Sequence, residues 1–203
     1  EPDNVFAYLN LGVIFITTRR IDLALIALNR AVELKPDLVA AHLRLAEIYE
    51  GQGNLPEAVR EYEEAYLYLK ADESPEGKAI IGRLENLQKI VEVRELFERG
   101  IALRRAGKYN QSEEMFREVL SIQPQNAQAH NFLGIILGIQ NRFDDAIQSF
   151  KESVHIKPDF SDSRIRLAEL YQIQGELKEA RLELEKAIFF LEDKDGAEAQ
   201  LLE

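Results

Sequence analysis

Small residues recur at a fixed spacing in the apolar helical pattern of this chain. A small residue in one apolar run is followed 12 positions later by Ala or Ser, and an aromatic residue or leucine comes 4 positions after that. The five sets are Gly12, Ala24 and Leu28; Ala46, Ala58 and Tyr62; Gly100, Ser112 and Phe116; Gly134, Ala146 and Phe150; and Ala168, Ala180 and Leu184. A recurring period of about 34 residues predicts a stack of repeats, not a globule with one central core.

Each repeat is expected to contain two helices. In the first repeat, apolar residues follow a helical period up to Phe15 and again from Leu23, with polar residues between the two runs. Pro36 lacks the amide proton that a continuing helix needs, and Asp37 can cap the next helix. The predicted repeats span 5–38, 39–72, 93–126, 127–160 and 161–194.

Residues 73–92 fall outside this period and predict an extra helix. Ser74 can cap that helix and Pro75 can open it, and apolar residues then follow one helical face. Between residues 82 and 106 only Gly100 interrupts the helical pattern, and the repeat itself places a glycine there. We therefore expect the extra helix to continue directly into the repeat that starts at residue 93, joining a two-repeat block to a three-repeat block.

A second, longer period relates the two blocks. Repeats one and two precede repeats four and five by 122 residues, and the segment 43–49 returns in similar form as 165–171. The pattern predicts a piece of a longer array, built from units of three repeats and an extra helix. On this interpretation residues 195–203 start a further, cropped helix. Chance similarity between degenerate repeats is the alternative explanation.

The repeat pattern resembles the tetratricopeptide repeat family. In the first copy the signature positions hold Tyr8, Leu11, Gly12, Phe15, Ala24, Leu28, Ala31 and Pro36, although the tryptophan of the family pattern is absent. The resemblance implies an all-α fold, a right-handed α-solenoid superhelix of antiparallel helix pairs with a concave groove.

Composition narrows the range of partners. The formal net charge of −11 argues against nucleic acid or an anionic membrane surface as the main partner, since both would repel the chain. No apolar stretch approaches the roughly 20 residues that span a bilayer, so direct membrane insertion is not expected. The chain has no cysteine, so the compartment stays open, with a soluble, cytoplasmic protein favoured.

The sequence offers no constellation of catalytic residues. His42 and His130 stand at the repeat position where family members have an aromatic ring that packs between the helices. Neither histidine has a second histidine at the helical spacing of metal ligands. No glycine-rich phosphate loop is present, and neighbouring acidic pairs on a helix diverge. We therefore expect neither an enzyme nor a bound metal or cofactor.

The resemblance implies which side chains line the groove, because family members use fixed positions of each first helix. Carried over to this chain, the expected partner-binding residues are Phe6, Leu9, Val13, Leu43, Arg44, Glu47, Phe97, Ile101, Arg105, Asn131, Ile135, Ile139, Ile165, Arg166 and Glu169. Most of them are apolar, which suits an amphipathic helix or an extended peptide with apolar anchors. Alternatively, these side chains cover one another, or the long helix shields them.

The sequence therefore predicts a non-catalytic scaffold that holds a peptide or helix of a partner protein. Self-association into a homo-oligomer and recruitment of substrates for a larger multidomain enzyme are the two alternatives. Replacement of Phe97 and Ile101 by serine is expected to abolish partner binding and to leave the helices intact.

Overall fold

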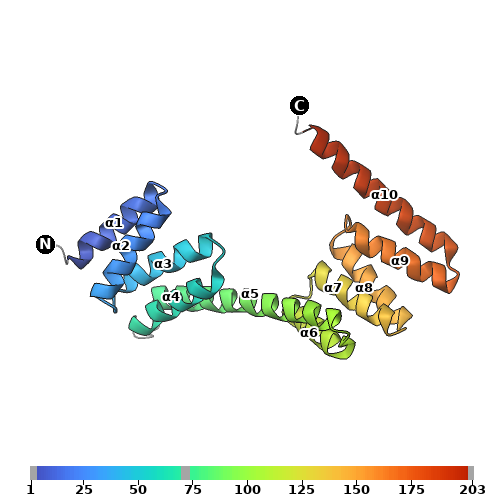
Figure 1. Cartoon of the computed structure of the whole chain (residues 1–203), viewed down its shortest axis with the longest axis horizontal. Coiled ribbons are helices and arrows are strands. Elements are labelled where there is room, and N and C mark those ends of the chain that lie inside the picture. The colour runs from blue at the N-terminus through green and yellow to red at the C-terminus, as the bar shows by residue number, and fades with distance from the viewer. Residues whose placement is uncertain (1–3, 70–73, 201–203) are drawn as a thin grey trace. The chain divides into compact units, whose positions relative to one another are not determined.

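The computed structural model describes residues 4–69 and 74–200, and all regular structure in this part of the chain is α-helical. The helices are α1 (Val5–Thr17), α2 (Ile21–Leu34), α3 (Val39–Gly51), α4 (Leu55–Tyr68), α5 (Pro75–Arg105), α6 (Tyr109–Ile122), α7 (Ala127–Ile139), α8 (Phe143–Ile156), α9 (Ser161–Gln174) and α10 (Leu177–Gln200). They form two compact units, Glu1–Glu92 and Val93–Glu203, and the boundary lies within α5. In both units consecutive helices form hairpins (Figure 1), which confirms an all-α helical repeat.

The small residues hold the two helices of a hairpin close together. A Cβ added to Gly134 would lie 2.8 Å from the ring of Phe150, and one added to Gly12 would lie 2.6 Å from Leu28. These distances are shorter than van der Waals contact, so only glycine fits without displacement of the facing side chain. The 16-residue spacing between the members of each pair therefore reports a direct contact between the helices.

A left-handed residue follows the first helix of every hairpin. Gly53, Gly107 and Gly175 have φ of 75°, 74° and 81°, as expected for glycine after a helix C-terminus. Arg19 and Asn141 occupy the same place in the other two hairpins, with φ of 58° and 61°. All five repeats therefore share the same turn geometry, although the residue at the left-handed position differs between them.

The first unit contains two connected layers of apolar side chains. Ala24, Leu28 and Leu45 belong to a cluster that joins α1 and α2 to α3. A second cluster packs the alanines and Tyr62 of α3 and α4 against the first half of α5, which contributes Ile80, Leu84 and Leu87. The extra helix thus covers the last face of the second repeat.

The second unit is built around three phenylalanine rings. The ring of Phe97 on α5 meets those of Phe116 on α6 and Phe132 on α7 edge-on, with centroids 5.2 and 5.4 Å apart. Phe116 and Phe132 stack in parallel at 5.2 Å. Since these contacts join three helices, the second half of α5 forms part of the core of this unit.

The 122-residue period is also visible in the helix caps. The side-chain oxygen of Asn4 accepts a hydrogen bond from the amide of Ala7 at 3.1 Å, and Asn126 accepts one from Ala129 at 3.0 Å. Asparagine is a favoured N-cap because it satisfies an otherwise unpaired helical amide. At the other end of the chain, α10 continues to Gln200, so no helix ends at the boundary expected at residue 195.

Candidate partner-binding site

A pocket of about 430 Å³ lies in the second unit, where the expected groove residues of two repeats meet. Its apolar wall is formed by Ile135 and Ile139 of α7 and Ile173 of α9. Ile139 is 44% exposed and Ile173 is 64% exposed, so a ligand can reach both side chains. We call this cavity the α7–α9 pocket. Exposed apolar side chains around a concavity are typical of binding sites.

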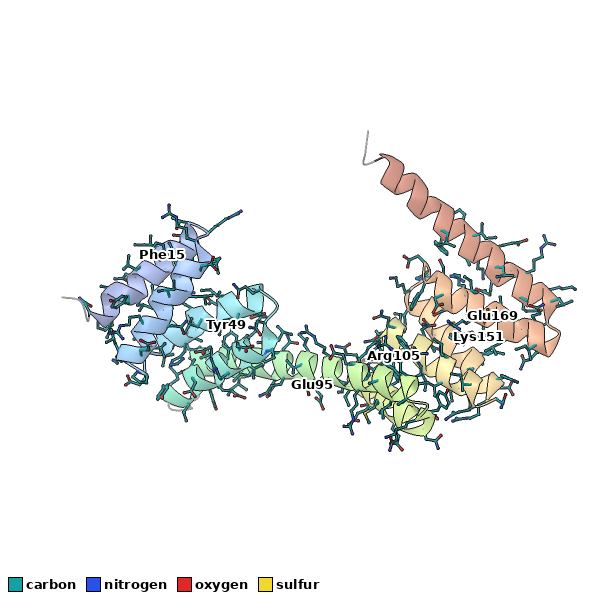
Figure 2. All side chains as sticks on the ribbon, in the orientation of Figure 1. Phe15, Tyr49, Glu95, Arg105, Lys151 and Glu169 are labelled. Carbon is teal, nitrogen blue, oxygen red and sulfur yellow. The ribbon has the colours of Figure 1, made fainter. Side chains whose placement is uncertain are left out.

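Two arginines give the α7–α9 pocket a positive edge. Arg104, in the last turn of α5, lies with its guanidinium 5.5 Å from the ring centroid of Phe132. Its buried Nε has no hydrogen-bond partner among the described residues. Arg166 also lines the pocket, and its Nε lies 3.3 Å from the carboxylate of Asp162. Glu169 contributes a carboxylate to the lining of this pocket; Figure 2 labels it on α9.

Asn131, which was expected to line the groove, is buried and hydrogen-bonded within the structure. Its side chain is 3% exposed, donates to Asp162 at 2.9 Å and accepts from Ser163 at 2.9 Å. Ser163 in turn bonds to Ser153 at 2.7 Å. Asn131 therefore holds the carboxylate that pairs with Arg166, and so acts on the pocket indirectly.

A larger pocket, of about 610 Å³, lies in the first unit between α3, α4 and the first half of α5. We call it the α3–α5 pocket. Leu43 and Glu47 were expected in the groove, and Glu50, Glu76 and Arg83 join them. Arg83 donates from Nε to Glu50 at 2.9 Å. With three carboxylates and one guanidinium along its lining, the α3–α5 pocket carries a negative potential.

Tyr62 is a further polar group in the α3–α5 pocket. Its hydroxyl donates to Glu50 at 3.3 Å. Burial and the charge of Glu50 raise the pKa of Tyr62 above its ordinary value of 10.0, so the phenol keeps its proton at neutral pH.

The remaining expected groove residues differ in accessibility. Phe6, Val13, Arg44, Arg105 and Ile165 are exposed, whereas Leu9, Leu43, Phe97 and Ile101 are partly buried in the cores of their own units. Figure 2 labels Arg105 near the end of α5. Arg44 forms an ion pair with Glu47 at 2.6 Å. Part of the expected apolar lining therefore packs against the cores of its own units.

Several pocket residues were absent from the expected set. Glu76, Ala79, Ile80 and Arg83 come from the extra helix, to which the positional pattern of a 34-residue repeat does not apply. Arg104 and Ile173 occupy groove positions of the family pattern, but neither residue type alone distinguishes a ligand contact from a solvated surface. The charge of each pocket could be recognised only after the helices were placed.

His42, for which a packing role was expected, contacts groups of its own repeat. His42 is buried between α3 and α4, where it contacts Glu61 and the carbonyl of Pro36. Within residues 4–69 and 74–200, no group of three or more His, Asp or Glu side chains is arranged to hold a metal ion. In the same ranges no helix is both long and apolar enough to cross a bilayer.

Comparison with known proteins identifies the repeat. A tetratricopeptide repeat family model matches residues 9–77 and 97–159, and a second model of the same description matches residues 139–202. The crystal structure of MamA is similar with a TM-score of 0.50 and 18% identity, over 92% of this chain and 97% of that one. The TPR domain of P58(IPK) gives a TM-score of 0.52 and 20% identity, over 95% of this chain and 52% of that one.

A curated plant protein resembles part of the sequence. The probable UDP-N-acetylglucosamine–peptide N-acetylglucosaminyltransferase SPINDLY of Solanum lycopersicum is 28% identical over 122 residues, which is 60% of this chain. The match spans 13% of the length of that protein.

Helical repeats of this kind present extended surfaces on which other proteins bind. The family models together cover most of the described helices, and the fold has known structural neighbours of the same type. The chain therefore belongs to the tetratricopeptide repeat family.

Proposed function

We propose that the chain is a non-catalytic scaffold whose α7–α9 pocket holds an apolar side chain of a partner protein next to an acidic group. The observation that carries this proposal is the combination of an open isoleucine wall with an arginine whose Nε has no hydrogen-bond partner among the described residues. Ile139 and Ile173 supply the wall, and Arg104 supplies the cation. Arg104 lines the pocket, where its guanidinium could donate hydrogen bonds to a ligand carboxylate or carbonyl.

The charge of the whole chain makes this pocket distinctive. An overall charge of −11 repels acidic partners, yet Arg104, Arg105 and Arg166 create a local positive potential at the end of α5 and on α9. An acidic group on the partner would then fix the register of binding, while the apolar side chain supplies most of the affinity.

The α3–α5 pocket favours the opposite charge. Its apolar base includes Leu43 and Ile80, and its lining contains the carboxylates of Glu47, Glu50 and Glu76. Arg44 pairs with Glu47 and Arg83 pairs with Glu50. A lysine or arginine of a bound peptide would suit this pocket, with its aliphatic stem on the apolar base.

Selection of peptides from a random display library on the purified chain tests the proposal. Peptides that bind should contain a large apolar residue close to Asp or Glu. The Kd of a selected peptide, measured by fluorescence anisotropy, should increase at least about tenfold in Ile139→Glu and in Ile173→Glu. Ile26→Glu is the matched control, because Ile26 is 68% exposed on α2 and lines neither pocket.

Arg104→Gln separates the acidic from the apolar contribution. The substitution should weaken the binding of peptides that contain an acidic residue. It should have little effect on the same peptides when Asn or Gln replaces the acidic residue. Equal binding by the Ile139→Glu variant and the unsubstituted chain would reject the α7–α9 pocket as the site.

Self-association is a second candidate function. Phe6, Ile14 and Ile26 are large apolar residues of α1 and α2 with more than half of their surface exposed. Association of copies through these side chains would bury them. Sedimentation across a hundredfold dilution series would detect it, and a constant monomer mass would exclude it.

A recruiting role within a larger enzyme is the third candidate. The partial similarity to a probable glycosyltransferase favours it, although the match covers a small share of that protein. Here too the chain would contribute binding, and catalysis would belong to residues outside this sequence.

A further inference from the structure

A pair of charged residues recurs at the 122-residue period, once on α3 and once on α9. Arg44 and Glu47 of α3 correspond to Arg166 and Glu169 of α9. In both helices three positions separate the arginine from the glutamate, and at this spacing the two side chains can form an ion pair. Comparison of the two copies therefore shows whether their surroundings change the pairing.

The arginine has a different partner in each copy. In the first unit Nη1 of Arg44 lies 2.6 Å from the carboxylate of Glu47. In the second unit Nε of Arg166 lies 3.3 Å from the carboxylate of Asp162, one turn earlier on α9. Glu169 is exposed and forms no ion pair with any residue that the structure describes. The carboxylate that is paired in the first unit is thus unpaired in the second.

Two residues of the second unit account for this difference. Asp162 stands where the first unit has Ala40, and Asn131 stands where it has Leu9. The amide of Asn131 donates to the carboxylate of Asp162 at 2.9 Å, which fixes that carboxylate beside the arginine. Alanine and leucine have no polar group for either contact. The second unit therefore contains a polar network that leaves Glu169 available in the lining of the α7–α9 pocket.

The α7–α9 pocket has an unpaired charge of each sign on two different helices. Arg104 of α5 forms no ion pair within residues 4–69 and 74–200, and it lies against Phe132 of α7. Glu169 belongs to α9, which also contacts α7. Since α7 contacts both helices, its Ile135 and Ile139 form the apolar wall between the two charges. A ligand with an acidic group alone would leave the carboxylate of α9 without a partner.

We propose that the segment bound in the α7–α9 pocket carries a lysine or arginine as well as an acidic residue, on opposite sides of its apolar anchor. This proposal rests on the proposed binding of a partner segment in this pocket. Arg104 receives the acidic group, and Glu169 is the specificity-determining residue for the basic one. Asn131 and Asp162 are positioning residues, because they hold Arg166 away from Glu169.

The charge of the whole chain favours such a partner. A net charge of −11 attracts basic groups at long range, so a lysine or arginine assists the approach of a segment whose acidic residue is repelled. The two charges of the bound segment thus serve different steps, since the basic residue speeds encounter and the acidic residue recognises the local cation.

Peptides selected on the unsubstituted chain from the random display library are the probes for this proposal. Relative to the unselected library, Lys or Arg should be enriched on the side of the apolar residue that is opposite to Asp or Glu. Replacement of the basic residue by Gln should raise the Kd in fluorescence anisotropy about two- to fivefold, as expected for an ion pair with an exposed carboxylate. High salt should abolish this difference.

Glu169→Gln assigns the effect to one carboxylate. This variant should bind the selected peptide and its Gln version with equal Kd. Asp162→Ala should have the same result, because Arg166 can then pair with Glu169 as the equivalent residues do in the first unit. Glu152→Gln is the matched control, since Glu152 is exposed on α8 of the same unit and does not line the pocket. Circular dichroism shows whether each variant retains its helix content.

Two results would overturn the proposal. One is a set of selected peptides with no enrichment of basic residues, and the other is a preference for the basic residue that persists in Glu169→Gln. A preference that persists only in Asp162→Ala would reject the positioning role of the polar network. These results differ from a failure of the pocket itself, which equal binding by Ile139→Glu and the unsubstituted chain would reveal.

Discussion

Nδ1 of His42 lies 2.7 Å from a carboxylate oxygen of Glu61, and its Nε2 lies 2.7 Å from the carbonyl oxygen of Pro36. Both ring nitrogens thus face acceptors, and a neutral imidazole has only one N–H to donate. Burial disfavours the charged ring, but the hydrogen bonds to Glu61 and Pro36 outweigh it and raise the pKa of His42 above 6.5. The imidazolium satisfies both contacts.

In the second unit an arginine takes the place of this histidine. Arg164, 122 positions after His42, donates to the carbonyl of Pro158 at 2.8 Å and to Glu183 at 2.5 Å. The two arrangements share a cation between a proline carbonyl and a buried carboxylate. They differ in that only the histidine can lose its charge near neutral pH.

The stability of the first unit is therefore expected to fall as the pH rises above neutrality. A group with a raised folded pKa contributes its full stabilisation below the unfolded pKa, near 6.5, and loses it as the pH passes the folded value. Urea unfolding at several pH values between 6 and 9, followed by circular dichroism, measures this loss.

His42→Arg is the control for this pH dependence, because it reproduces the pair found at Arg164. The variant should unfold at nearly the same urea concentration across this pH range. An unsubstituted chain with the same flat profile would show that folding does not raise the pKa of His42.

Removal of one member of the Arg164–Glu183 pair should destabilise the second unit strongly. Arg164→Met leaves a buried carboxylate that still has an ion pair with Lys186, at 2.7 Å, and we expect a loss of about 3 kcal/mol. Arg164→Met combined with Glu183→Leu removes both charges and should recover most of that loss. Thermal unfolding of the unsubstituted chain, the single variant and the double variant measures this recovery. A double variant less stable than Arg164→Met alone would contradict a coupled pair.

Two glycine substitutions should have opposite effects. Gly134→Ala forces a methyl group against the ring of Phe150, and we expect a loss of about 1–3 kcal/mol. Gly82→Ala, in α5, meets nothing within 4 Å and should stabilise the chain by about 0.5–1 kcal/mol, since alanine favours the helix. Melting temperatures that move in the same direction for both variants would contradict the assigned helix contact.

The left-handed turn predicts a stabilising substitution at Arg19. Its φ of 58° is strained for a residue with a Cβ, and three of the other four repeats have glycine at this place. Arg19→Gly should therefore raise the free energy of unfolding by about 0.5–1 kcal/mol, despite the greater flexibility of glycine in the unfolded chain. A lower melting temperature would mean that Arg19 makes a compensating contact.

Phe97→Ser is expected to disturb folding as well as binding, in contrast to the expectation from sequence. The ring of Phe97 packs against Phe116 and Phe132, so its loss should cost about 3–5 kcal/mol. Ile139→Ser, at an exposed wall of the pocket, should cost less than about 1 kcal/mol. Chemical denaturation of both variants tests this difference, and equal stabilities would place Phe97 outside the core.

The helical repeat followed from sequence because its signal is local and repeated five times. The spacing from Gly12 to Leu28 directly encodes one helix contact, and Gly100 with Phe116 and Gly134 with Phe150 encode it again in two further hairpins. The long α5 was expected for the same reason, since nothing in its sequence breaks a helix, and the structure has it from Pro75 to Arg105.

The details of the site were less predictable, because they depend on contacts between repeats. Asn131 is polar and lies at a groove position, but Ser163 and Asp162 satisfy its amide within the structure. Arg104 is one of several basic residues in the sequence, and only its place over Phe132 distinguishes it. Neither property has a signature in residue spacing.

The three-ring cluster has a consequence for the speed of ligand exchange. Phe97 and Arg104 lie seven residues apart on α5, which is two helical turns, and Phe132 contacts both. The contact with Phe132 thus restricts the guanidinium before a ligand binds in the way we propose. A preorganised cation loses little side-chain freedom on complex formation, so bound peptides should dissociate slowly for the small area they cover.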